Sequence, residues 1–170
     1  MELKEYIQNE ISGQKRNIDR VLKDLTQAEY AWRPASGCNS IGLILFHVAK
    51  SEDNFVQATL QGKPTLWESE KWYQKLNIPQ NEDGAHYNAD QVNAFPVPPD
   101  KELVAFFNTV REKTIAYVAT LKVADFDKKF SMPHFGDITA AGMCSLIVGH
   151  AAGHIGEMSY IRGIQRGLDK

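Results

Sequence analysis

The chain has 170 residues, of which 43% are hydrophobic and 24% are charged. This length is typical of one domain, and the composition is that of a globular protein, which excludes a disordered or collagen-like chain. We therefore expect a single domain over residues 1–170.

The charge balance and the cysteines limit the classes of partner. The sequence has 19 Lys and Arg residues against 21 Asp and Glu residues, a net charge of −2, and no basic run, so no nucleic-acid partner is expected. Its two cysteines, Cys38 and Cys144, fit no zinc-ribbon spacing, which favours a reducing compartment. No leader and no apolar stretch of about 20 residues stands out, so we expect a cytoplasmic protein without a membrane partner.

The first two helices follow from apolar spacing and capping residues. Apolar side chains recur at steps of three, four and seven over residues 3–25, which is typical of an amphipathic helix. The helix is expected to end before Trp32, because Pro34 disfavours helix in the residue before it. Asn39 and Ser40 are predicted caps for a second helix over residues 41–60.

The remaining elements are a long link and two more helices. Residues 62–99 form an unusually long connection, of a kind that is often functional. Asp100 is a predicted cap of the third helix, residues 122–138 are predicted as a loop, and the fourth helix is predicted from near Thr139 to about Gly167. With no convincing strand, the pattern predicts an all-α fold: a four-helix bundle with a long crossover between helices 2 and 3.

The fourth helix has polar, titratable side chains in the middle of its apolar face. A helical wheel places His150, His154 and Glu157 there. Burial of unpaired imidazoles is costly, so these groups need partners or an ion. His150 and His154 are four residues apart and point to one side of the helix, an arrangement that lets both bind one metal ion.

The second helix offers a third imidazole. His47 interrupts an apolar face there, and Ser51 and Asn54 share that face as the best candidates for a substrate pocket. If the two faces meet in the core, three imidazoles converge and leave coordination positions open. Three protein ligands with an open position indicate a catalytic metal site and not a closed structural one.

Glu157 is the nearest carboxylate, and it is the candidate catalytic residue. The segment from His150 to His154 lacks the glutamate of the HExxH protease helix, so a zincin is not indicated. Glu157 could be a fourth ligand, an orienter of an imidazole or a general base. The alternative is a solvated helix charge that pairs with Arg162 or Arg166.

Three stretches of the sequence match a known pattern. Residues 32–34 (WRP) precede the His47 segment over residues 40–52, and residues 150–157 read H-x3-H-x-G-E. In this order they resemble the DinB/YfiT-like superfamily of metal-dependent bundle proteins.

This resemblance covers most of the chain and carries expectations with it. It implies a four-helix bundle with a long link, a divalent metal on His47, His150 and His154, and a homodimer. Characterised relatives include thiol transferases that use low-molecular-weight thiols such as bacillithiol, and a mycothiol-dependent isomerase.

The leading hypothesis is therefore a divalent-metal-dependent enzyme that acts on a small molecule, as a thiol (S-)transferase or a hydrolase. The three imidazoles suit a transition metal such as Zn, Ni or Fe, and a low-molecular-weight thiol is a candidate cosubstrate. One alternative is a non-catalytic, stress-associated bundle whose metal only stabilises the core. Another is a metal-free protein with a hydrogen-bonded histidine cluster.

Other candidate residues have weaker support. His134, in the loop before the fourth helix, is interpreted as an exposed loop histidine, and His86 has less support still. Cys144 lies about 120° from His150 on the wheel and is expected to be buried. Trp67, Trp72 and Tyr73 suggest a short helix in the link; with Tyr87 they could form a lid or a dimer contact, although anchoring of the link is favoured.

Overall fold

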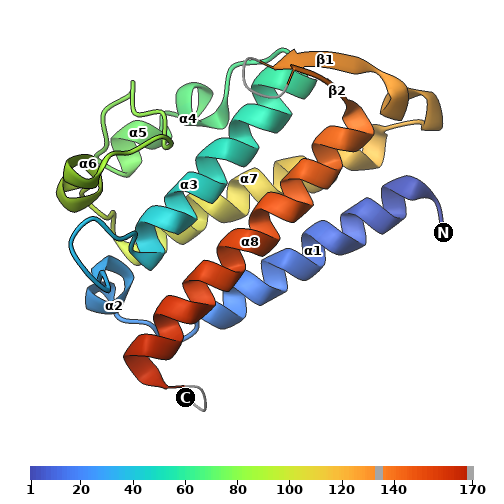
Figure 1. Ribbon diagram of the computed structural model, residues 1–170. Helices are drawn as coiled ribbons and strands as arrows, with labels where there is room; N and C mark the ends of the chain where they lie inside the picture. Colours follow the sequence, from blue (N-terminus) through green and yellow to red (C-terminus); the bar gives the residue numbers. More distant parts are fainter. Residues whose placement is uncertain (133–135, 168–170) are drawn as a thin grey trace.

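The computed structural model describes residues 1–132 and 136–167, and within them four long helices lie side by side (Figure 1). They are α1 (Leu3–Leu22), α3 (Ile41–Asp53), α7 (Asp100–Thr120) and α8 (Ala140–Arg166). A π-helical segment, η1 (Asn54–Leu60), continues α3. The predicted four-helix bundle is confirmed.

The direction of the helices explains the long crossover. In Figure 1, α3 and α7 pack against each other and run the same way, whereas α1 and α8 run the opposite way. Because two parallel helices need a connection that returns along the bundle, the chain crosses over between them. Residues 61–99 make this crossover and contain α4 (Leu66–Ser69), α5 (Trp72–Lys75) and α6 (Ala89–Ala94), where a single short helix was expected.

The predicted helix caps are confirmed in part. The hydroxyl of Ser40 accepts a hydrogen bond from the first turn of α3, as predicted, and the hydroxyl of Thr139, near which the fourth helix was expected to begin, accepts one from the first turn of α8. Asp100 is not a cap: Pro99 holds that position, and Asp100 is the first helical residue. The first helical stretch is also shorter than expected, because a new cap at Thr26 starts a separate helix, α2 (Gln27–Ala31).

The expectation of no strand is wrong for the segment before α8. After a 3-10 turn, η2 (Val123–Asp127), the strands β1 (Lys129–Met132) and β2 (Gly136–Thr139) form an antiparallel hairpin in which Phe130 lies opposite Ile138. Strands of four residues are too short to show an alternating pattern in the sequence. The hairpin leads directly into α8, since the Ala140 N–H donates to the Lys128 carbonyl at 2.9 Å.

The aromatic residues of the crossover anchor it to the bundle. Trp67 is 1% exposed, and its ring centroid lies 5.5 Å from that of Phe46 and 5.7 Å from that of Phe106. The buried carboxylate of Asp53 accepts the N–H groups of Leu66 and Trp67, both at 2.9 Å, and so fixes the start of α4. The crossover is thereby tied to the end of α3.

A buried ion pair joins α3 to α7. Arg111 Nε lies 3.0 Å from Glu52 Oε2, and the two side chains are 1% and 3% exposed. Burial raises the pKa of Glu52, while the charge of Arg111 opposes this shift. Pairing offsets part of the cost of removing both charges from water.

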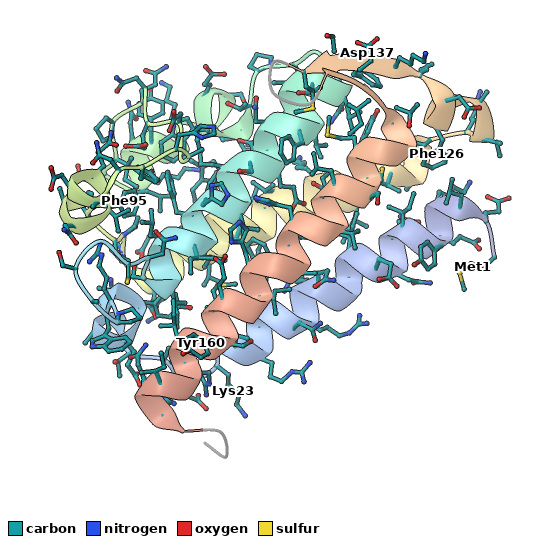
Figure 2. All side chains as sticks on the ribbon, in the orientation of Figure 1. Met1, Lys23, Phe95, Phe126, Asp137 and Tyr160 are labelled. Carbon is teal, nitrogen blue, oxygen red and sulfur yellow. The ribbon has the colours of Figure 1, made fainter. Side chains whose placement is uncertain are left out.

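The outer surface of the bundle carries scattered hydrophobic side chains. Figure 2 places Tyr160 near the C-terminal end of α8 and Asp137 in the hairpin at the opposite end of the bundle. Tyr160 is 73% exposed, as single surface aromatics often are.

Among the described residues, no helix combines the length and the apolar character that crossing a membrane requires.

Candidate metal centre

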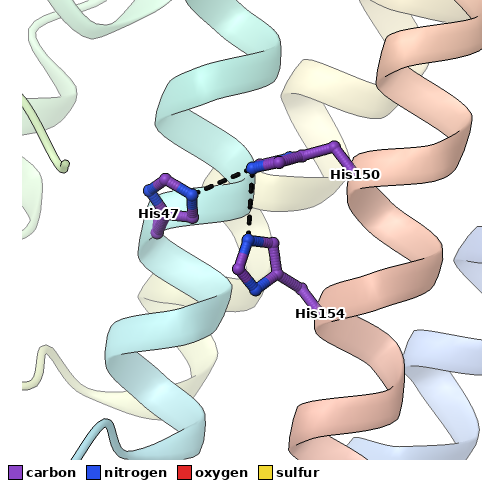
Figure 3. A group of neighbouring side chains, drawn as sticks. All are labelled: His47, His150 and His154. Atoms are coloured by element: carbon purple, nitrogen blue, oxygen red, sulfur yellow. Dashed lines mark hydrogen bonds between the residues drawn. The ribbon is translucent and has the colours of Figure 1, made fainter. Parts of the chain in front are cut away.

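Three imidazoles meet between α3 and α8. His47 comes from α3, and His150 and His154 come from successive turns of α8 (Figure 3). The Nε2 atom of His150 lies 2.9 Å from Nε2 of His47 and 3.2 Å from Nε2 of His154. The structure therefore brings together the three histidines that the sequence indicated, and one ligand nitrogen of each lies within 4.8 Å of the others.

The Nδ1 atom of His47 faces a backbone carbonyl. It lies 2.7 Å from the Gly84 oxygen, which can only accept a hydrogen bond. The proton of the neutral ring is therefore on Nδ1, and Nε2 carries a lone pair on the side of His150 Nε2, which lies 2.9 Å away.

Glu157 contacts Nδ1 of His154, as the Gly84 carbonyl contacts Nδ1 of His47. Its Oε2 lies 2.8 Å from His154 Nδ1, so the carboxylate accepts the proton of that nitrogen and leaves a lone pair on Nε2. Of the alternatives for Glu157, this arrangement matches the orienting one. The arginines that could have paired with it are engaged elsewhere: Arg162 donates to the Val21 carbonyl, and Arg166 pairs with Glu29.

Burial favours the neutral form of two imidazoles of this cluster, His47 and His150. It lowers the pKa of His150 to about 4 and also lowers the pKa of His47. The Gly84 carbonyl opposes the shift at His47, and the neighbouring His154 adds to it at both sites. Metals bind the neutral ring, so His47 and His150 need lose no proton to bind a cation at neutral pH.

The cluster fits a cation better than it fits a set of hydrogen bonds. With lone pairs on Nε2 of His47 and His154, at most one proton, on His150, lies among the three nitrogens. That proton can make only one good hydrogen bond, so one of the three half-buried nitrogens receives no proton from within the cluster. Metal–nitrogen bonds of about 2.0–2.1 Å would separate neighbouring ligand nitrogens by about 2.9 Å in an octahedron and about 3.3 Å in a tetrahedron. The two separations from His150 Nε2, 2.9 and 3.2 Å, fall in this range, and the third pair of ligand nitrogens lies within 4.8 Å.

A cavity of about 780 Å³ adjoins the cluster. His47 and His150 line it, together with Ser51 and Asn54, the two residues that the sequence suggested for a pocket. Its wall is apolar at Phe55, Trp67 and Leu146. This combination of an apolar wall with a few polar groups is typical of small-molecule sites.

A second, smaller cavity lies against the same cluster. It measures about 230 Å³ and is lined by His47 and His154, with Leu43, Ile44 and Tyr87 among its other residues. His47 therefore borders both cavities, whereas His150 borders only the larger one and His154 only the smaller one.

The structure brings two further residues to the site that no sequence pattern had singled out. His86, in the crossover, lines both cavities, and Lys50 lines the larger one with its Nζ 4.4 Å from the centroid of Trp67. Nothing in the spacing of the link indicated how it would return to the bundle.

His134 lies outside the described residues. Cys144 is buried, as expected, and burial raises the pKa of its thiol to about 11.

The sequence also matches a family model. The model of the DinB superfamily matches residues 10–158. The chain belongs to the DinB superfamily. No functionally curated protein matches the sequence.

Two solved structures share the fold of this DinB superfamily member. A conserved protein from Enterococcus faecalis superposes with a TM-score of 0.87 at 19% identity, over 99% of each chain. YfiT from Bacillus subtilis superposes with a TM-score of 0.66 at 15% identity, over 99% of this chain and 91% of YfiT. YfiT is described as "a probable metal-dependent hydrolase with an unusual four-helix bundle topology". At these identities the likeness establishes the fold alone.

Proposed function

We propose that the protein is a divalent-metal-dependent enzyme that activates a small nucleophile, either as a hydrolase or as a thiol transferase. The observation that carries this proposal is the convergence of three imidazoles, two of which line the wall of a cavity of about 780 Å³. A divalent ion at such a site lowers the pKa of a bound water or thiol and so provides a nucleophile at neutral pH.

The protein residues have distinct roles in this proposal. His47, His150 and His154 hold the ion through Nε2, and Gly84 and Glu157 keep protons on the Nδ1 atoms of His47 and His154. Ser51 and Asn54 offer hydrogen bonds to the substrate from the cavity wall. Three imidazoles suit Zn, Ni or Fe, and the choice among them depends on availability. The homodimer implied by the resemblance and the cytoplasmic location expected from the sequence stay predictions.

Removal of the metal tests this function directly. Protein stripped with a chelator is expected to lose activity in a panel of ester, amide and thiol-conjugation assays, and one equivalent of Zn, Ni or Fe should restore it. Full activity after stripping would contradict the proposal. A large loss of thermal stability without activity under any metal would instead favour the non-catalytic metal-binding bundle.

Replacement of Glu157 separates a positioning role from a catalytic one. If its carboxylate orients His154, Glu157→Ala is expected to weaken zinc binding by about tenfold or more, whereas Glu157→Gln, which keeps an acceptor oxygen, should weaken it less. A general base would behave differently, because both variants would then lose turnover while zinc affinity stayed the same. Zinc competition with a chelator and kcat on the reconstituted enzyme distinguish these two patterns.

A further inference from the structure

Part of the crossover lies directly against the turn of α3 that carries His47. Gly84 is buried there with a φ of +78°, a conformation that favours glycine. A Cβ at this position would lie 2.9 Å from Lys50 Cβ and 3.4 Å from Phe46 Cε1. Since Lys50 Cβ is close to the helix backbone and cannot swing away, only glycine permits this approach.

The approach brings the Gly84 carbonyl to His47. The oxygen lies 2.7 Å from Nδ1, although the two residues are 37 positions apart in the sequence. Among the described residues, the hydrogen-bond partner of that nitrogen is the Gly84 oxygen, so the tautomer of His47 depends on a contact with the crossover.

Hydrogen bonds on both sides hold the crossover in this place. Trp67 Nε1 donates to the Gln80 carbonyl at 2.9 Å. The Tyr87 hydroxyl donates to Glu82 Oε1 at 2.9 Å, and the same oxygen accepts the Gly84 N–H at 3.2 Å. The Gly84 carbonyl is therefore supported by the fold of the link and not only by its contact with His47.

We propose that Gly84 is a positioning residue of the metal centre: its carbonyl fixes His47 as the Nδ1–H tautomer and directs the Nε2 lone pair at the ion. This inference rests on the proposed function in so far as it takes the three imidazoles to be metal ligands. It adds that the crossover is a structural part of the centre. The helices α3 and α8 supply the three ligands, but the crossover decides which nitrogen of His47 carries the proton.

A matched pair of glycine variants tests the effect on metal binding. Gly84 and Gly62 both have positive φ angles, +78° and +62°, so alanine imposes a similar backbone cost at each. A Cβ at Gly62 would meet nothing within 4 Å. We expect Gly84→Ala to weaken zinc binding by about tenfold to a hundredfold, the usual cost of losing a partner behind a ligand, and Gly62→Ala to leave it unchanged. Competition with a chromophoric chelator measures both affinities without an activity assay.

The tautomer of His47 provides a second readout that a purely structural role would not change. In metal-free protein, nitrogen-15 NMR of the imidazoles, assigned with the His47→Gln variant, should show a proton on Nδ1 of His47 in the wild type. Gly62→Ala should show the same signature, and Gly84→Ala should show a mixture of the two tautomers.

Two results would overturn the proposal: a wild-type His47 protonated on Nε2, or a folded Gly84→Ala variant with unchanged zinc affinity. If Gly84→Ala does not fold, the wild-type tautomer decides. Failure of the wild type to bind any metal would refute the proposed function, whereas the tautomer of His47 would still test the role of Gly84.

Discussion

Replacement of His150 by alanine is expected to abolish stoichiometric metal binding. The Nε2 atom of His150 is the one that lies near both other imidazole nitrogens, at 2.9 and 3.2 Å, so its loss separates the remaining ligands. Elemental analysis of untagged protein should find close to one equivalent of a transition metal in the wild type and none in His150→Ala.

His86→Ala is the matched control for this experiment. His86 lines the same cavity but is not part of the cluster of metal-binding groups, so the variant should keep its metal. Added zinc should also raise the melting temperature of the wild type and of His86→Ala but not of His150→Ala, since a ligand stabilises only a protein that binds it; about 2.7 kcal/mol is expected at a hundredfold excess over Kd. Equal metal content in the wild type and in His150→Ala would contradict the assignment of this ligand.

Arg111→Met is expected to cause the largest loss of stability, about 3–5 kcal/mol near neutral pH. The variant leaves the carboxylate of Glu52, which is 3% exposed, without its counter-charge. Chemical denaturation followed by circular dichroism measures the change. Lys113→Met, at an exposed position of the same helix, should change stability by no more than about 0.5 kcal/mol.

The loss in Arg111→Met should depend on pH. Burial already raises the pKa of Glu52, and removal of the opposing arginine raises it further. A folded-state pKa above the unfolded value of about 4.3 means that the folded variant binds the proton more tightly, so its stability falls as the pH rises above that value. The variant should therefore be more strongly destabilised at pH 8 than at pH 5. A double variant, Glu52→Leu with Arg111→Met, should recover much of the stability and lose this pH dependence; equal destabilisation of the single and double variants would refute the explanation.

The helices and the two-histidine face could be predicted because both depend on local geometry. The spacing of His150 and His154 puts them on one side of any α-helix, wherever that helix packs. The cap at Ser40 likewise acts on a backbone group within the same turn, and the start of the fourth helix was expected near Thr139, which caps it. The predicted cap at Asp100 was wrong because Pro99 occupies the cap position and Asp100 is the first helical residue.

The sequence by itself thus determined the bundle, the crossover and the histidines that could meet. The tertiary structure decided which distant groups contact the histidines, the buried charges and the cavity. The Gly84 carbonyl behind His47, the Glu52–Arg111 pair and the return of His86 to the cavity all join segments far apart in the chain. No periodicity reports such contacts, because they depend on how the crossover and α7 pack on α3. The hairpin before α8 was missed for a related reason, since its short strands are defined by their pairing with each other and not by a pattern within either one.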